Sequence, residues 1–542
     1  MEKCMMPPRA EGNLISKVNA LPVLLILLVS FAVYANIFSN GFVGDDAGMV
    51  VGNPSVRSFA AFTRSFANIP AVFERPSAGA YYRPVSYGLA FMVIYSIFGL
   101  KAWAFHLANV ALHAANAVLV YLLGLLLIGR RRFALVAALL FAVHPVNTDA
   151  VDLASAISEP MYSFFFLACI VLFAEERMPW LQGALCLLSA LSKEPGVMIP
   201  AVLISYGLCI GGRFSWRKYV PFLPALAIYF LLRWNAFRVI TFVSSSSSLN
   251  LWQLILNSFP LFAKYMGKLA FPAVLNAAYT FHPVSSPFEF KVAVSLLVTA
   301  CVAGLMALFW KKNRRAFFCC ILALAPLLPA FYVLRLPFFT VFAERYLYLS
   351  TAGFALLVSI GLERLSCLKN AIWKKAAPVV AAMVAVLAVT AGAAITVKRN
   401  PVWKSNETLW GDTAAKSPDN PVPYTYLGFV ANDKGHAREA VYFCDKALRI
   451  KPTYDSLVCL GIAYNMLGRS GIAKAAFSDA ASLNPGAAEP HYRLALLYLK
   501  KGDLAGFQRQ FGLARKLNPG AAGLYASLAQ KEAAGSAARV KK

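Results

Sequence analysis

The sequence Asn-Gly-Phe-Val-Gly-Asp-Asp at residues 40–46 begins two residues after the first long apolar run, residues 21–38, has ended. Because roughly 20 apolar residues can cross a bilayer, this segment is predicted to lie against the membrane surface. Its two glycines allow backbone angles that side chains forbid, so the acids can turn back toward the bilayer. Asp45 and Asp46 could then act as a general base or bind a hard cation. The alternative is a solvated pair of loop acids.

The composition is that of a polytopic membrane protein. The chain has 542 residues, of which 59% are hydrophobic and 14% are charged, whereas a soluble domain carries about 25% charged residues. The net charge of +27 is spread over several short loops, which indicates membrane topology rather than nucleic-acid binding. The ten cysteines are scattered without metal-ligand spacing. We expect a large helical membrane domain, a smaller soluble domain, a lipid bilayer as partner, and no nucleic acid.

Eleven apolar runs are predicted to cross the membrane, with the N-terminus in the cytoplasm and the first run retained as an anchor. With this count every strongly basic loop lies inside, and the loop 144–160, which has no Lys or Arg, lies outside. The runs are 21–38, 104–128, 133–143, 161–174, 180–191, 197–210, 219–232, 292–310, 316–331, 346–362 and 378–397. The basic residues are Lys3, Arg9, Lys17, Arg130–Arg132, Arg213, Arg217, Lys218, Lys311, Lys312, Arg314, Arg315, Lys369, Lys374 and Lys375.

Two further apolar segments are predicted to lie at the outer surface. If Pro84–Leu100 crossed, every later loop would change sides and the arginine triplet at 130–132 would face outward. We therefore place it as a surface helix within an outer loop spanning residues 39–103. The same reasoning keeps Leu251–Pro272, after the serine run 244–248, at the outer face, although an even number of extra crossings there would also satisfy the rule.

A repeat begins after Val397. A pattern of small residues and proline recurs at intervals of 33 and then 34 residues, which is the tetratricopeptide period of paired helices. It consists of Gly428, Gly435, Ala447 and Pro452, then Gly461, Gly468, Ala480 and Pro485, then Ala495, Gly502, Ala514 and Pro519. The glycines and alanines are expected where paired helices approach closely, and each proline at the end of a unit's second helix. The prediction is a transmembrane domain over 1–397 and a repeat domain over 398–542, with repeats at 423–452, 455–485 and 489–519.

Ionisable residues flank the apolar runs at four further outer positions, where burial of charge is costly and marks functional candidates. Three are the cations Arg83, Lys193 and Arg345, which suit a phosphate or diphosphate. The acids would activate an acceptor hydroxyl, since two adjacent carboxylates repel and the proton affinity of one rises. Ordinary salt bridges, such as Lys193 with Glu194, are the alternative. A possible metal or acceptor set is His144, Asp149, Asp152 and Glu159.

The ordered motifs resemble the transmembrane and tetratricopeptide-repeat O-mannosyltransferases, of the GT-C superfamily. They are Phe-Val-Gly-Asp-Asp at 42–46, Tyr-Tyr-Arg-Pro at 81–84, His-Pro-Val-Asn-Thr-Asp at 144–149, Ser-Lys-Glu-Pro-Gly at 192–196 and Ala-Glu-Arg-Tyr-Leu-Tyr-Leu at 343–349. The resemblance implies a GT-C helix bundle that transfers mannose or another hexose, with inversion, from a polyprenyl-phosphate carrier to a protein hydroxyl outside the cytoplasm. It implies that Asp45 or Asp46 corresponds to the family's acidic catalytic pair and acts as the general base, with Lys193, Arg345 and, less securely matched, Arg83 near the carrier phosphate.

Some members of the superfamily use a divalent cation such as Mg or Mn and others do not, so the metal is open. The repeats would recruit a secreted or membrane protein acceptor. They would be periplasmic if the chain lies in a bacterial inner membrane, and lumenal in a eukaryote. Three alternatives stand beside this interpretation: an oligosaccharyltransferase using a lipid-linked glycan, a non-enzymatic membrane-anchored repeat scaffold, and a transporter or flippase. The oxidation state of Cys444 and Cys459 is also open.

Overall fold

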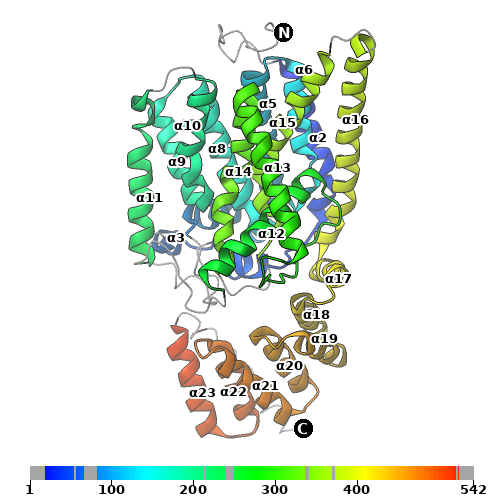
Figure 1. Ribbon diagram of the computed structural model, residues 1–542. Helices are drawn as coiled ribbons and strands as arrows, with labels where there is room; N and C mark the ends of the chain where they lie inside the picture. The colour runs from blue at the N-terminus through cyan, green and yellow to red at the C-terminus, as the bar shows by residue number, and fades with distance from the viewer. Residues whose placement is uncertain are drawn as a thin grey trace. The chain divides into compact units, whose positions relative to one another are not determined.

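The computed structural model describes residues 19–53, 56–65, 82–211, 215–237, 249–335, 341–368, 373–519, 523 and 526. Within these residues the chain forms helices and loops, without strands, and it divides into two compact units (Figure 1). One unit ends at Ser405, and the other contains the residues from Asn406 onward together with Ala278–Thr280. The predicted all-helical class is confirmed. The predictions that concern Lys3, Arg9, Lys17, Tyr81, Arg213, Ser244–Ser248 and Lys369 lie outside the described residues.

The first unit is a bundle of apolar helices. In the described ranges, six helical segments are long and apolar enough to cross a membrane, or up to seven if a bent pair is one span, and four shorter apolar helices accompany them. The number of crossings stays a prediction. The longer helices are α2 (Ala20–Val33), α5 (Ala102–Ile128), α6 (Arg131–Ala142), α8 (Ser158–Ala174), α9 (Pro179–Ser192), α10 (Ile199–Cys209), α11 (Phe222–Phe237), α12 (Leu251–Ala270), α13 (Phe290–Lys312), α14 (Arg314–Leu324), α15 (Tyr348–Ser366) and α16 (Trp373–Arg399).

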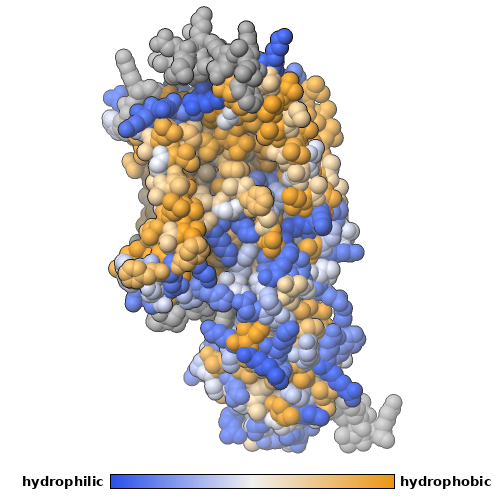
Figure 2. Space-filling view, turned by 45° about the vertical axis from the view of Figure 1, so that its right-hand side comes forward, coloured by the Kyte–Doolittle hydropathy of each residue, from blue (hydrophilic) through white to orange (hydrophobic). Residues whose placement is uncertain are grey.

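Apolar side chains cover much of the face of this bundle that Figure 2 shows. Leu297 on α13 and Leu387 on α16 are among many large hydrophobic side chains that are mostly exposed. A contiguous apolar surface of this kind is expected to face lipid rather than water. The first unit is therefore integral to a membrane.

The centre of the bundle is held by polar as well as apolar contacts. His113 Nδ1 and Asn116 Nδ2 on α5 lie 2.8 and 3.1 Å from the hydroxyl oxygen of Tyr348 at the start of α15. Gly353 lets α15 approach α14, since a Cβ there would lie 2.5 Å from the Ala323 nitrogen. These contacts fix the position of the segment that precedes α15.

Short helical segments connect the long helices and carry the candidate site. Residues 84–98 form a π-helical turn followed by a helix whose buried Phe91 and Ile94 pack with Val50 and Phe105. Whether this segment lies on the membrane surface stays a prediction. The segments are η2 (Ala35–Ser39), η3 (Ala47–Val51), α3 (Phe59–Ser65), η7 (Pro84–Ala90), α4 (Phe91–Phe98), η8 (Pro145–Asn147), α7 (Thr148–Val151), η9 (Ala154–Ile157), η10 (Glu194–Met198), η11 (Trp216–Tyr219), η12 (Ala325–Arg335), η13 (Glu344–Leu347) and η14 (Asn400–Lys404).

The second unit consists of paired helices at the tetratricopeptide spacing. Gly428 lies where helices approach closely, as predicted, because a Cβ there would meet the Cys459 sulfur at 2.5 Å. Gly435 and Gly468 instead take left-handed angles, φ +79° and +73°, in the turns between paired helices, so the close-approach prediction is wrong for them. Cys444 and Cys459 form a disulfide. The helices are α17 (Asn406–Lys416), α18 (Pro421–Asp433), α19 (Ala437–Ile450), α20 (Tyr454–Met466), α21 (Ser470–Leu483), α22 (Ala488–Lys500) and α23 (Leu504–Leu517).

Candidate active site

The two aspartates after α2 have different surroundings. Gly44 takes a left-handed angle, φ +52°, which turns the chain so that Asp46 points inward. Asp46 is fully buried, and its carboxylate accepts hydrogen bonds from the backbone N–H groups of Val43 (3.0 Å) and Ser155 (2.6 Å). Asp46 therefore closes its own turn and ties it to η9. Gly41, in contrast, has no left-handed angle, so the prediction that it needs glycine for this reason is wrong.

Asp45 faces outward. Its side chain is 54% exposed, and its Oδ2 lies 3.7 Å from Nη2 of Arg345. The pKa of the neighbouring Asp46 is raised to about 6, mainly by burial, with the charge of Asp45 contributing least. The predicted cause, repulsion between adjacent carboxylates, is therefore a minor one. Asp45 is the acid of this pair that an acceptor can reach.

Arg345 lies between two carboxylates from different parts of the sequence. Its backbone N–H donates to Asp149 Oδ2 at 3.0 Å, and its Nη1 lies 3.4 Å from Asp149 Oδ1. Asp149 is buried, while Arg345 is 27% exposed. The buried acid thus holds the arginine so that the other edge of its guanidinium faces Asp45.

The other two predicted cations are paired as well, though not as the sequence suggested. Lys193 forms a buried ion pair with Glu159, and Arg83 Nη2 donates to Glu194 at 2.7 Å. The alternative pairing of Lys193 with Glu194 is wrong. Burial is the main cause that lowers the pKa of Lys193 to about 8, and Glu159 opposes it. All three cations act electrostatically on Glu159.

The aromatic residue after Arg345 links these pairs. Lys193 Nζ lies 4.6 Å from the centre of the Tyr346 ring and 5.6 Å from that of Tyr162, which is within the range of a cation–π attraction. The structure therefore brings Asp45, Arg345 and Asp149 into one cluster, with Lys193 beside it.

Two predicted residues take no part in this cluster. The Nε2 atom of His144 lies 3.1 Å from the Leu269 carbonyl oxygen, and its ring stands edge-on to Phe354. Asp152 is fully buried, and within the described structure neither carboxylate oxygen has a hydrogen-bond partner. Burial raises the pKa of Asp152 well above its usual range. Both residues have surroundings that favour a neutral side chain.

The carboxylates do not form a metal site. Among the described residues no group of three or more His, Cys, Asp or Glu side chains is placed to hold a metal ion. The carboxylates of Asp46, Asp149 and Glu159 are instead engaged by N–H or ammonium donors. This arrangement does not fit the divalent cation that some members of the superfamily use.

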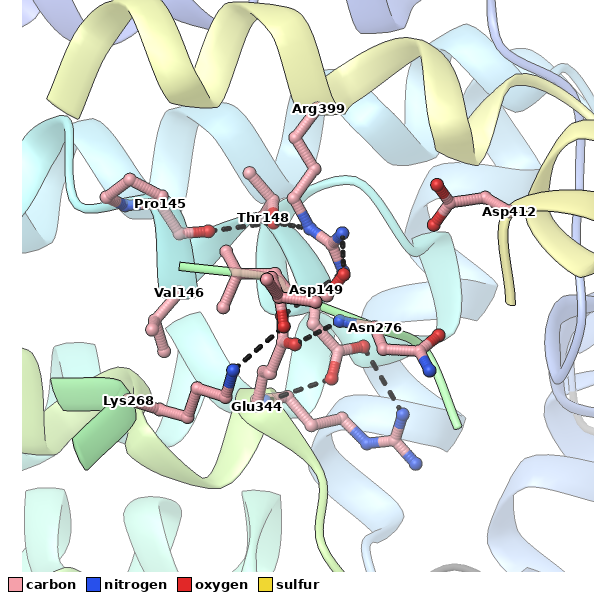
Figure 3. Close-up of polar contacts among 12 residues, drawn as sticks. Pro145, Val146, Thr148, Asp149, Lys268, Asn276, Glu344, Arg399 and Asp412 are labelled. Carbon is pink, nitrogen blue, oxygen red and sulfur yellow. Dashed lines mark hydrogen bonds and ion pairs between the residues drawn. The ribbon is translucent and has the colours of Figure 1, made fainter. Parts of the chain in front are cut away.

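Two charged residues that the sequence analysis did not single out lie beside Asp149 and Arg345. Glu344 is fully buried, and its Oε2 lies 3.2 Å from Nη2 of Arg399 (Figure 3). Arg399 is the second of two basic residues that follow the last apolar run, and Glu344 is the acid directly before Arg345. These positions were signals that could have identified both.

The fold and this cluster define a class of protein: an integral membrane protein with a charged site between its helices and an added domain of tetratricopeptide-type repeats. No family model matches the chain. The chain resembles curated protein O-mannosyl-transferases, which confirms the resemblance named from its motifs. It is 26% identical over 530 residues to Protein O-mannosyl-transferase TMTC3 of Mus musculus, covering 88% of this chain and 56% of the relative.

A second relative is Protein O-mannosyl-transferase F38B6.6 of Caenorhabditis elegans, 27% identical over 454 residues, covering 80% of this chain and 63% of the relative. The chain thus spans little more than half the length of the first of these relatives. Among solved structures, ArnT from Cupriavidus metallidurans bound to undecaprenyl phosphate matches 86% of this chain and 80% of its own, at 16% identity and a TM-score of 0.38.

Proposed function

We propose that this chain is a membrane glycosyltransferase that moves a hexose, mannose or another, from a polyprenyl-phosphate carrier to a hydroxyl of a secreted or membrane protein. The observation that carries the proposal is the pairing of an exposed acid with a partly exposed cation: Asp45 and Arg345 lie 3.7 Å apart. In an inverting transfer the base and the phosphate-binding group act on opposite faces of one sugar carbon, so the two side chains must line one site and move apart to admit the sugar. The protein O-mannosyl-transferases that the chain resembles support the reaction class.

In the proposed reaction Asp45 takes the proton of the acceptor hydroxyl while its oxygen attacks the anomeric carbon. The bond from that carbon to the carrier phosphate breaks on the opposite face, so the configuration is inverted. The phosphate leaves with the negative charge. Arg345, which is partly exposed, is the cation best placed to contact it, whereas Lys193 is buried and acts from a longer distance. Arg83, paired with Glu194, adds positive charge behind them.

The proposal includes an orientation and a division of labour between domains. Residues 1–397 would transfer the sugar at the non-cytoplasmic face, and residues 398–542 would hold the acceptor through the repeats at 423–452, 455–485 and 489–519. The distribution of basic loops supports a cytoplasmic N-terminus. In a bacterial inner membrane the repeats would then be periplasmic.

The decisive experiment compares Asp45→Asn with Asp46→Asn in the purified chain. The substrates are undecaprenyl-phosphate [14C]mannose and a pool of serine- and threonine-rich peptides. We expect Asp45→Asn to lower the transfer rate about 10²–10⁴-fold with an unchanged melting temperature, because this side chain is 54% exposed and its ion pair is with the partly exposed Arg345. Full transfer by Asp45→Asn would remove it as the base. Mass spectrometry of the product distinguishes a single hexose from a glycan block.

A further inference from the structure

The residues that directly follow α16 contact both sides of the proposed site. We call Arg399–Lys404 the clasp: it contains the last residue of α16 and the 3-10 turn η14. None of these residues carries a proposed chemical step. Their hydrogen bonds nevertheless reach the segments that precede Asp45, Asp149 and Arg345.

One arm of the clasp is the side chain of Arg399, which is buried and bonded by all three of its nitrogens (Figure 3). Nε donates to Thr148 Oγ1 at 3.1 Å, Nη1 to the Leu275 carbonyl at 2.7 Å, and Nη2 to Glu344 Oε2 at 3.2 Å. Thr148 and Glu344 are the residues directly before Asp149 and Arg345. Arg399 thus bonds to the residue before Asp149 and to the residue before Arg345, and so holds both partners of the Arg345–Asp149 pair in place.

Glu344 is itself fixed at its other oxygen. Oε1 accepts a hydrogen bond from the Asn276 backbone N–H at 2.6 Å, so the carboxylate bridges the arginine and the chain after α12. A guanidinium has a rigid planar fork of donors, which a lysine cannot reproduce. The direction of Glu344, and with it the start of η13, therefore depends on this arginine.

The other arm holds the segment that leads to Asp45. Asn400 Nδ2 lies 2.9 Å from the Val33 carbonyl and 2.6 Å from Asn36 Oδ1. Its carbonyl accepts from Asn40 Nδ2 at 3.3 Å, and the Lys404 carbonyl accepts from the Gly41 N–H at 3.0 Å. This second arm therefore binds the chain from the end of α2 to the beginning of the Asp45 turn.

We infer that Arg399 and Asn400 are positioning residues: the clasp sets the distance and direction between Asp45 and Arg345. This inference rests on the proposed function. The evidence is that two consecutive residues bond to the two sides of the site. Arg399 bonds to Thr148, which directly precedes Asp149, and Asn400 bonds to the Val33 carbonyl at the end of α2, before the Asp45 turn. In the alternative, the Arg399–Glu344 pair only balances two buried charges. A displacement of about 1 Å at a reacting centre costs roughly 10²-fold in rate, whereas charge balance alone affects stability.

The test uses Arg399→Met together with Glu344→Gln, because Arg399→Met alone would leave Glu344 buried without its cation and could fail to fold. The double variant removes both charges at similar volume. We expect its melting temperature to stay near that of the parent chain, while transfer of mannose falls about 10–100-fold. Asn400→Ala tests the second arm with no change of charge. The matched control is Arg315→Met with Glu363→Gln, an ion pair at the other end of α15, and we expect it to keep full transfer.

Backbone hydrogen exchange provides a readout that needs no activity. We expect faster exchange at 343–347 in the Arg399/Glu344 variant and at 40–46 in Asn400→Ala, each about tenfold, and unchanged exchange there in the control. Unchanged exchange in both clasp variants, or faster exchange with full transfer, would overturn the inference. Absence of transfer in the parent chain would instead contradict the proposed function, and the exchange data would still decide whether the clasp holds the two segments.

Discussion

The two ends of α15 both carry ion pairs that include a buried carboxylate, but these pairs are built differently. We call the C-terminal end of α15 the arginine end and its N-terminal end the site end. At the arginine end, Glu363 lies 3.2 Å from Arg130 Nε and 3.8 Å from Arg315 Nη1, so two arginines share one carboxylate. At the site end, Arg345 contacts two carboxylates, Asp45 and Asp149. Two cations thus share one carboxylate at the arginine end, whereas two carboxylates share one cation, Arg345, at the site end.

This difference in charge pairing is what the proposed roles of the two ends predict. Excess Arg and Lys beside apolar helices is expected wherever a protein faces the cytoplasm, and it requires no chemistry. Buried charges matched one by one are costly to form and are retained where a site needs them. At the site end there are three cation–carboxylate pairs, Lys193–Glu159, Arg83–Glu194 and Arg345–Asp149, whose cations all act electrostatically on Glu159. A further acid, Asp45, is left largely exposed. The pairing at the site end is therefore what we expect of the proposed catalytic site, and the excess of arginine at the other end is what we expect of a topological anchor.

The largest effect we predict is on stability and follows from Lys193. Lys193→Met leaves Glu159 buried without its cation, which we expect to cost about 3–5 kcal/mol of unfolding free energy. Adding Glu159→Gln to Lys193→Met should restore most of the lost unfolding free energy. As a control, Lys218→Met removes an exposed pair with Glu176, and we expect a change below about 1 kcal/mol. Denaturation in detergent measures all three. A loss below about 1 kcal/mol for Lys193→Met would mean that Glu159 does not depend on this cation.

The next effect distinguishes the two ends by activity. Arg345→Gln should lower mannose transfer about 10²–10³-fold, because a charged donor to the leaving phosphate is lost. Arg315→Gln, the matched change at the arginine end, should alter transfer less than about twofold. Initial rates with undecaprenyl-phosphate mannose measure both. Equal losses in the two variants would erase the distinction between the ends.

The sequence predicted which residues gather at the site end better than it predicted how they pair. Loop charge placed Asp45, Lys193 and Arg345 on one side of the membrane, and the structure brings Asp45 and Arg345 together. The ion-pair partners were not predictable, because the adjacent side chains of Lys193 and Glu194 point apart where the extended Lys193 meets the 3-10 turn that begins at Glu194. Pairing depends on side-chain direction, which a pattern of charges does not contain.

The same limit explains the residues that were missed or misread. Arg399 and Glu344 are separated by the whole of α15 and α16, so only the packed bundle shows that they meet. In the repeats, Gly428 and Gly435 fit one periodic pattern, yet the first allows close packing and the second a left-handed turn. A period identifies the unit but not the role of each glycine within it.

The smallest predicted effect is a pH dependence that belongs to the site end. Burial raises the pKa of Asp46 to about 6, so in the folded chain Asp46 binds a proton more tightly than in the unfolded chain. Its contribution to stability is therefore fully present below the pKa of the unfolded chain and is lost as the pH rises through about 6. Between pH 5 and pH 7 the loss should be about 1 kcal/mol.

Asp46→Asn has no titrating group at this position, so the difference in unfolding free energy between the parent chain and this variant isolates the effect. From pH 5 to pH 7 we expect the parent chain to lose about 1 kcal/mol of unfolding free energy relative to the variant. Asp152, whose pKa burial also raises, acts in the same direction but is present in both chains and cancels. A difference that shifts toward the parent chain would mean that the N–H donors of Val43 and Ser155 outweigh burial and favour the ionised carboxylate. The pKa of Asp46 would then lie below that of an ordinary aspartate, and Asp46 would be ionised throughout this pH range.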